Sequence, residues 1–449
     1  MMHGTKLPLL LLLAPLVWGA DQDPAPSGQP LALSLKRAVE LAISPDGNYS
    51  IQEQQEVVRQ TKAQSAEVRS ALLPNVGGYL SETSQIRSLA ALGSNTVKLP
   101  FNFHLPNIAG PYPITDIRAN ATQTVFDFSA IRRWQAARKA VHASEAEREH
   151  ATNEVSALVA KAYVAALHAD ADVEAATADV VLAKALVTQA ENEKNSGTGT
   201  GIDVTRQRVK LSDQTQHLLD AENNRTKTHL QLLRTIGLRL DTEVQLTDKL
   251  VYTPVESMTI EQAKAEAFKN REDYKAQQAQ EDSVRLQASA AKWQRLPTFF
   301  TWGDYGTIGQ SDVAIIPTRD FGATLKFQFY DGGRMDAQRV EESSRYRGEQ
   351  IRTNDLKQQI ELDVRTSLDS LHSAEKQVAV AQEGLELADN ELAQARRRYE
   401  AGVTNGLEVT DAQTQLEHAR DNQILALFNY NLARVDLGEA MGTIRRLIQ

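Results

Sequence analysis

The sequence contains no cysteine, few aromatic residues and, after its first twenty residues, no long apolar run. Because the sequence has no cysteine, neither disulfides nor thiolate metal sites can form, and lipidation of an N-terminal cysteine is not expected. No later window approaches the ~18 consecutive apolar residues that a membrane-spanning helix needs. If the mature protein enters a membrane, we therefore expect it to do so through strands.

Motifs for catalysis and cofactor binding are also missing. The sequence has nine histidines, but they are scattered and none stands in H-E-x-x-H spacing, so no metal site is predicted. There is no G-x-x-x-x-G-K-[ST] nucleotide loop and no G-x-S-x-G nucleophile elbow. We predict that the protein is not an enzyme and uses no cofactor.

The composition favours long helices in an acidic protein. Hydrophobic residues make up 41% and aromatic residues 6%, and Ala, Gln and Glu are abundant, which is typical of long, closely packed helices rather than a globular α/β enzyme. The net charge of −9 argues against a nucleic acid as partner.

Residues 1–20 have the pattern of a signal for export. Lys6 provides the positive start, Leu7 to Trp18 form the apolar core, and Gly19-Ala20 is a small-residue cleavage site. The alternative is an N-terminal membrane anchor, but the apolar run is short and contains proline. We predict export with cleavage.

The most informative property of the sequence is that the same motifs occur twice, in the same order. Asp203 and Glu408, for example, are 205 residues apart (408 − 203 = 205). A period this long exceeds that of a solenoid repeat, so it indicates a whole module that was duplicated and fused. The paired features are Leu73-Pro74 with Leu296-Pro297, Phe126-Asp127 with Tyr330-Asp331, Asp203 with Glu408, and Gly237 with Gly442.

Each half contains a stretch that predicts one very long helix. Residues 129–195 and 334–400 contain no proline and little glycine, and each can span about 100 Å at 1.5 Å per residue. Small and branched residues recur every three or four positions, which predicts a close heptad seam. The seam positions are Ala151, Val155, Leu158, Ala162, Ala165, Ala169, Val173, Ala176, Val180, Ala183, Val187 and Ala190, and later Ala412, Leu416, Ala419, Gln423, Ala426, Tyr430, Ala433 and Leu437. Further helices are predicted to begin at Ser34 and at Thr259, which with Gln262 forms a capping box.

Between these helices, four short segments have the two-residue period of strands. The clearest begins at Phe321, where apolar residues alternate with Thr324 and other small or polar residues. Strands are predicted near 75–87, 115–127, 298–309 and 320–330, with loops at 88–114 and 310–319. Four strands cannot close a barrel, and open sheet edges are not tolerated in lipid. Either the strands form a soluble sheet or several chains pool them.

The chain therefore divides into a signal peptide, two structural repeats and a linker. The predicted bounds are 1–20 for the signal peptide, 21–237 for the first repeat, 238–258 for the linker or equatorial segment, and 259–449 for the second repeat.

These motifs resemble the TolC-type family of outer-membrane efflux channel proteins over essentially the whole mature chain. The most specific ones are the opening Leu35-Lys-Arg-Ala38-Val-Glu-Leu-Ala42, Phe329-Tyr-Asp331-Gly332-Gly333-Arg334, Tyr399-Glu-Ala-Gly402 and Leu407-Glu408-Val409-Thr-Asp411-Ala412. Two positions depart from the family pattern. Phe128-Ser129 replaces a glycine pair, and Thr404 stands where the best-studied member has a gate arginine.

The resemblance implies a mainly α fold with membrane β structure, built from duplicated helix-strand-strand-helix halves. Three chains would pool their strands into a twelve-stranded outer-membrane β-barrel that continues into a periplasmic α-helical coiled-coil barrel. The implied function is a passive exit duct of a tripartite efflux or type I secretion system. The implied partners are two further copies, a periplasmic adaptor (membrane fusion protein), an inner-membrane pump of RND or ABC type, and outer-membrane lipid.

The candidate functional residues lie at two tight turns. Gly197 and Gly201, and Gly402 and Gly406, interrupt the long helices, since glycine tolerates the conformations that end a helix. The spacing alone indicates ordinary helix ends, where acidic residues are favoured by the dipole. The resemblance instead implies a periplasmic aperture or gate made by Asp203, Tyr399, Glu408 and Asp411.

One rival interpretation is a periplasmic coiled-coil adaptor or structural protein that never enters a membrane. It explains the helices and the signal, but not four strands placed symmetrically between helix pairs. The second rival, an enzyme on a helical bundle, requires an inward-facing polar cluster that the sequence does not suggest.

Overall fold

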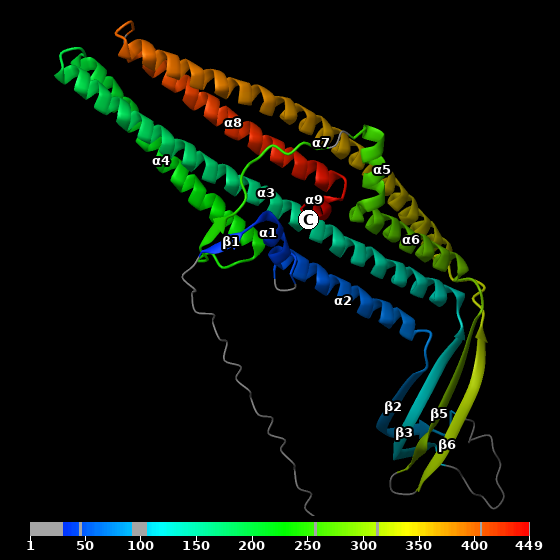
Figure 1. Cartoon of the computed structure of the whole chain (residues 1–449). Coiled ribbons are helices and arrows are strands. Elements are labelled where there is room, and N and C mark those ends of the chain that lie inside the picture. The colour runs from blue at the N-terminus through cyan, green and yellow to red at the C-terminus, as the bar shows by residue number, and fades with distance from the viewer. Residues whose placement is uncertain are drawn as a thin grey trace, which may run out of the picture.

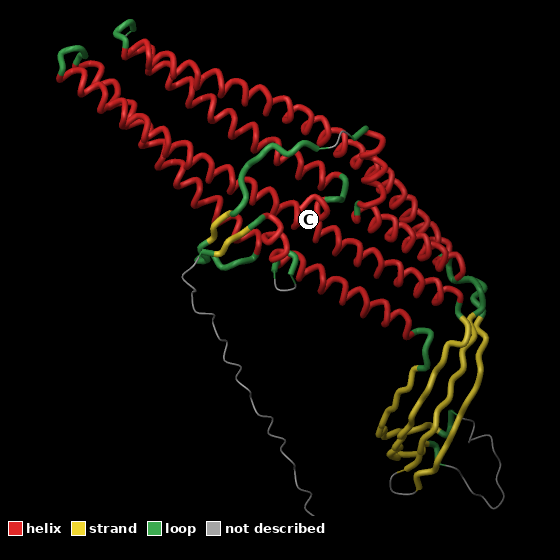
Figure 2. Tube along the Cα trace, in the orientation of Figure 1, coloured by secondary structure: helices red, strands yellow, loops and turns green. Residues whose placement is uncertain are grey.

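The computed structural model describes residues 30–44, 47–91, 106–255, 258–310, 314–404 and 406–448. The predicted signal peptide and the middle of the predicted loop 88–114 lie outside these residues. The chain is elongated, with a sheet at one end and two helical hairpin turns at the other (Figures 1 and 2). The fold is thus mainly α-helical, with an antiparallel sheet and a duplicated arrangement.

The first half contains β1 (Leu31–Leu33), α1 (Leu35–Ala42), α2 (Tyr49–Ser70), β2 (Asn75–Ser88), β3 (Ile108–Phe126), α3 (Phe128–Asn195) and α4 (Gly201–Ile236). After β4 (Val244–Leu246), the second half contains α5 (Ile260–Asn270), α6 (Glu272–Trp293), β5 (Thr298–Gln310), β6 (Ala314–Lys326), α7 (Arg334–Glu400), α8 (Gly406–Ala440) and α9 (Ile444–Ile448). Two long hairpins, α3/α4 and α7/α8, dominate the molecule.

The predicted helix starts are confirmed. The Ser34 side chain accepts a hydrogen bond from the amide of Arg37 at the start of α1. Thr259 and Gln262 form the predicted capping box of α5. Both predicted long helices are continuous in the structure, as α3 and α7.

The four longer strands form one antiparallel sheet in the order β2-β3-β5-β6. The register pairs Ala121 with Val76 and Gly303, and Gly303 with Phe321. The next residue along each strand points to the opposite face, where Thr122 pairs with Trp302, and Trp302 with Gly322. One face therefore carries mainly apolar and small side chains, and the other mainly polar ones, as the alternation in the sequence predicted.

Two strand bounds differ from the prediction. β3 begins at Ile108, inside the segment predicted as a loop from its Pro and Gly content. Its Pro113 pairs with β2 but lies beyond the last pair with β5, Thr115 with Gly309, so β3 is an edge strand there and tolerates proline.

β6 is shifted toward the N-terminus relative to the predicted strand 320–330. It runs from Ala314 to Lys326, because Lys326 pairs with the first residue of β5, Thr298, and no partner strand extends further. Most of the predicted loop 310–319 is therefore strand. Phe327 and Phe329 continue the apolar alternation outside the sheet, where they stack on each other at 6.0 Å.

The two halves join strand to long helix differently. In the second half, Gly332 and Gly333 both have positive φ (74° and 87°) before α7 begins. In the first half, Phe128 and Ser129 occupy this junction, and the side chain of Asp127 directly accepts a hydrogen bond from the amide of Ala130. The second half uses the equivalent aspartate as well, since Asp331 accepts from the amide of Met335 at 3.0 Å, so the first half keeps the side-chain bond without the glycine pair.

The seam of α8 is confirmed, but the single seam predicted for α3 is wrong at one position. Leu158 is 53% exposed. Around it, α3 is covered from two sides: Val159 and Tyr163 pack in a core with α1 and α4, and Ala157 and Ala160 pack against α8 and α9. In this part of α3, the buried residues therefore lie on two faces of the helix and not along a single seam.

Candidate functional site

The two hairpin turns lie together at the end opposite the sheet and share one backbone geometry (Figure 1). Gly197 and Gly402 have φ of 81° and 70°, in the left-handed region that favours glycine. In both turns the amide after this glycine donates to a carbonyl five residues earlier, at 3.0 Å. Gly201 and Gly406 are the first residues of α4 and α8. The duplicated glycines therefore make duplicated turns.

Asp203 is bound into the start of its own helix. Its carboxylate accepts hydrogen bonds from the backbone amide of Thr200 at 3.2 Å and from the Thr200 hydroxyl at 2.5 Å. The Thr200 hydroxyl oxygen in turn accepts from the amide of Asp203, which completes a capping box. Arg206 lies 3.4 Å from the same carboxylate.

Glu408, the equivalent residue in the second half, is held differently. It accepts a hydrogen bond from the Thr404 hydroxyl, and its other carboxylate oxygen lies 3.1 Å from Nε of Arg398. Thr404 thus orients an acid of its own turn. Asp411 lies one turn further along α8 and is exposed.

Tyr399 links the two hairpins. Its hydroxyl donates a hydrogen bond to Glu193 on α3 and not to Asp203. Burial, followed by the hydrogen bond and charge of Glu193, raises the pKa of Tyr399 above its ordinary value, so the hydroxyl remains a donor. The buried Gly406 is close by: a methyl group there would lie 3.7 Å from Asp203 Oδ1 and 3.8 Å from the Tyr399 hydroxyl.

A row of polar side chains continues this contact between α4 and α8. Lys210 and Glu417 form an ion pair at 2.7 Å, with side chains only 16% and 12% exposed. Gln214 donates to the same Glu417 at 3.2 Å. Nearer the turns, Gln207 donates to the Thr410 hydroxyl at 3.0 Å.

This polar row is incompletely satisfied. Gln413 is fully buried, and neither its amide nitrogen nor its oxygen has a partner among the described residues. The carbonyl oxygen of Gln207 and one oxygen of Glu417 are also buried without one. A buried polar group without a partner costs roughly 1–3 kcal/mol, so this row stabilises the contact less than a fully hydrogen-bonded one would.

The structure therefore brings Asp203, Tyr399 and Glu408 to one end of the molecule, with Asp411 exposed nearby. Sequence analysis missed Glu193, Arg398, Lys210 and Glu417. The partners Tyr399 and Glu193 are separated by 206 residues in the chain, and no local pattern identifies a pair so distant.

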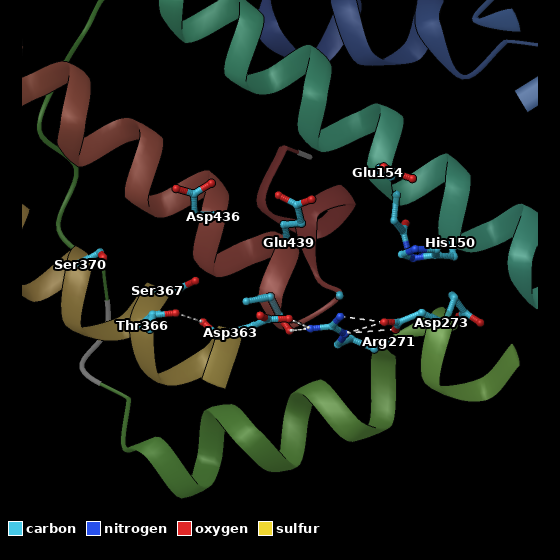
Figure 3. A pocket seen from close by; sticks show the side chains of 14 residues that line it. His150, Glu154, Arg271, Asp273, Asp363, Thr366, Ser367, Ser370, Asp436 and Glu439 are labelled. Carbon is cyan, nitrogen blue, oxygen red and sulfur yellow. Dashed lines mark hydrogen bonds and ion pairs between the residues drawn. The ribbon is translucent and has the colours of Figure 1, made fainter. Parts of the chain in front are cut away.

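A second polar region lies midway along the molecule, where α3, α5, α6, α7 and α8 meet (Figure 3). A cavity of ≈ 420 Å³ there is lined by mainly polar side chains, many of them acidic. Arg271 lies between Asp273, at 2.7 Å, and Asp363, at 2.8 Å. Burial raises the pKa of Asp273, but the hydrogen bonds and charge of Arg271 outweigh it and hold this pKa below its ordinary value of 3.8.

In the described parts of the chain, no group of three or more His, Cys, Asp or Glu side chains is arranged to hold a metal ion. No helix there is long and apolar enough to span a membrane.

The chain resembles several solved outer-membrane channels in fold. The match to CmeC of Campylobacter jejuni covers 91% of this chain and 85% of that chain, with TM-score 0.78 and 15% identity. The match to VceC of Vibrio cholerae covers 91% of this chain and 96% of that chain, with TM-score 0.76 and 17% identity. The match to MtrE of Neisseria gonorrhoeae covers 92% of this chain and 90% of that chain, with TM-score 0.76 and 16% identity.

Curated protein sequences contain no match to the chain. A family model, however, matches residues 46–238 and 264–443, one segment in each half. The model is described as outer membrane efflux protein, and neither it nor the similar folds are enzymes. This match decides against the interpretation as a periplasmic adaptor. The chain therefore belongs to the outer membrane efflux protein family and is an exit duct of tripartite efflux systems.

Proposed function

We propose that the exit duct is a homotrimer in which three sheets join edge to edge into a twelve-stranded barrel. In one chain, β2 and β6 are the edges of a four-stranded sheet. Open edges are not stable in lipid, because their backbone groups remain unpaired there. Joining β6 of one copy to β2 of the next removes every edge.

The side chains of the sheet support this arrangement. Phe321 and Leu325 lie on the apolar face and are exposed in the single chain, as expected for side chains that contact lipid. Two charges, Glu82 and Arg319, also lie on this face, near the middle of their strands, among the apolar majority. The polar face then lines the lumen.

We further propose that the helices extend into the periplasm and meet a periplasmic adaptor and an inner-membrane pump of RND or ABC type. The chain would reach the outer membrane after cleavage of the segment 1–20, without lipidation. This orientation is supported by the strands and the hairpin turns, which lie at opposite ends of the long helices (Figure 2).

The observation that supports a gate is the placement of acids from both halves at one end. Asp203 and Glu408 lie in the first turns of α4 and α8, Asp411 follows one turn after Glu408, and Tyr399 links α7 to α3. In a trimer these acids would form rings of like charge around one aperture. Such rings favour cations and can bind a multivalent cation that blocks the pore.

The assembly is tested by the mass of the protein in mild detergent. We expect a trimer that retains the circular dichroism of both helices and strands. A folded monomer in the same detergent would contradict the pooled barrel.

The gate is tested by recordings in planar bilayers. We expect a small, cation-selective conductance that trivalent cations block from the periplasmic side. Glu408→Ala combined with Asp411→Ala should weaken both the selectivity and the block, because it removes two of the three proposed carboxylates per chain. Ser343→Ala, at a half-buried position of α7 far from the turns, is the control. Unchanged selectivity and block in the double variant would show that these acids are ordinary helix-end residues.

A further inference from the structure

One hydrogen-bonded and ionic network on the polar face of the sheet includes a residue from every one of the four strands. Arg118 on β3 is its centre: Nε lies 2.7 Å from Asp116 of the same strand, and Nη1 lies 2.8 Å from Asp304 on β5. Asp320 on β6 is 3.9 Å from the same guanidinium. Tyr79 on β2 donates to Asp116 at 3.2 Å. We call these five residues the strand belt.

The register places the strand belt on one face. Arg118 pairs with Tyr79 and with Gly306, and Asp304 pairs with Asp320. A methyl group at Gly306 would lie 2.7 Å from the Cα and Cγ atoms of Arg118. The missing side chain at this position allows Arg118 to extend across β5 to Asp304.

The strand belt is not electrically neutral. Three carboxylates face one guanidinium, which leaves two net negative charges per chain. The side chains of Arg118, Asp116 and Asp304 are only 15%, 17% and 20% exposed, whereas that of Asp320 is 67% exposed and open to solvent. A fixed charge on the polar face is thus presented mainly by Asp320.

We propose that the strand belt is a second determinant of ion selectivity, in the barrel and separate from the acids at the hairpin turns. Asp320 and Asp304 are the specificity-determining residues, and Arg118 is a positioning residue whose own charge limits the selectivity. The inference rests on the proposed trimeric barrel, in which three copies surround the lumen with six net negative charges. The permeant class it favours is inorganic and organic cations.

The structure predicts opposite effects for two single substitutions. Asp320→Asn lowers the net negative charge of each belt, and Arg118→Met raises it. One unit charge about 8 Å from a permeating ion in water changes its local concentration roughly two-fold. Because the same charge changes the anion concentration in the opposite direction, and a trimer carries three copies, we expect the ratio of cation to anion permeability to fall at least about four-fold in Asp320→Asn, to fall further in Asp320→Lys, and to rise in Arg118→Met.

The measurement is the reversal potential across planar bilayers in a potassium chloride gradient. It is made in the otherwise unchanged protein and in the Glu408→Ala, Asp411→Ala background, where Asp203 is the one proposed gate carboxylate left in each chain and the barrel accounts for a larger share of the selectivity. Asp320 is exposed and 3.9 Å from its partner, so its variants should assemble even if Arg118→Met does not. Arg118→Lys, which keeps the charge, should retain the original permeability ratio.

Glu82→Gln is the matched control. It removes one carboxylate from β2 on the opposite, outward face, beside the row that contains Asp116. We expect no shift. Equal shifts in Glu82→Gln and Asp320→Asn, or an unchanged reversal potential in both Asp320 variants of conducting trimers, would overturn the inference. Wild-type protein that is not trimeric or does not conduct would overturn the proposed channel itself, and with it the strand belt.

Discussion

The two helical hairpins are nearly equal in length but differ in their surroundings. Helices α3 and α7 have 68 and 67 residues, and α4 and α8 have 36 and 35. Helix α3 lies in the middle of the molecule, where it contacts α1, α2, α4, α6, α8 and α9. Helix α7 lies at one side, packs mainly on α8 and α6, and has far fewer buried residues. Duplication therefore produced one hairpin that forms the centre and one that is attached to it.

The anchoring of the hairpins differs in chemistry as well. The first is held by a core that includes Leu33, Tyr163 and Leu232, which are almost fully buried. The second is held by Ala263, Ile360 and their neighbours, beside the ion-paired Arg271. An apolar core is insensitive to pH, but an ion-pair cluster is not.

At the turns, the same backbone presents its acids differently. Asp203 is occupied by the cap of its own helix, whereas Glu408 contacts Thr404 and Arg398 and Asp411 is exposed. The glycines fix the turn, while the side chains around them differ between the halves. Equal backbone geometry therefore does not imply equal function, and the second hairpin is the better candidate for the moving part of a gate.

Arg271→Ala should lower the free energy of unfolding more than the other substitutions, because it weakens the attachment of the second hairpin. Asp273 and Asp363 would lose their partner in a mostly buried site, which costs about 3 kcal/mol of unfolding free energy. Urea denaturation followed by circular dichroism measures the loss. Arg37→Ala is the control, since its pair with Glu40 is exposed and contributes below about 1 kcal/mol.

The same cluster predicts a dependence on pH. The pKa of Asp273 is below its ordinary value in the folded chain, so its contribution is complete above that value and is lost as the pH falls below about 4. Arg271→Ala should remove this acid-sensitive part. Equal loss of stability on acidification with and without Arg271 would contradict the assignment.

Tyr399→Phe should weaken the link between the hairpins without changing either one. Losing a hydrogen bond to the Glu193 carboxylate removes about 1.5 kcal/mol, which corresponds to a roughly ten-fold shift toward the separated state. Single-channel recordings should show more frequent opening. Tyr346→Phe, whose hydroxyl accepts a hydrogen bond from Gln350 of the same helix, should behave like the original protein. An unaltered open probability in Tyr399→Phe would exclude this link from the gate.

The smallest effects are expected at the turn glycines, and they should be equal in both hairpins. Gly197→Ala and Gly402→Ala each place a side chain in the left-handed region, at about 1 kcal/mol. Gly201→Ala should cost nothing, because a methyl group there meets no atom within 4 Å. Thermal unfolding compares the three. A much larger loss at Gly402 than at Gly197 would show that the second turn is held by contacts beyond its own backbone.

The sequence by itself determined the long helices, their caps and the turns between them. The Thr259–Gln262 cap and the glycines at 197 and 402 act over a few residues, so local physical rules predict them. Family motifs also indicated where the acids of the turns lie. The strand bounds were less predictable, because β6 ends where β5 supplies no further partner.

Only the tertiary structure decided which side chains meet across the two halves. The pairs Tyr399–Glu193, Lys210–Glu417 and Arg118–Asp304 join residues that are 206, 207 and 186 positions apart. Each depends on the helix packing or strand register that brings distant segments together, and no local periodicity encodes it. The duplicated sequence determined two similar hairpins, and their unequal burial was decided by packing, since only one of them can occupy the centre of the molecule.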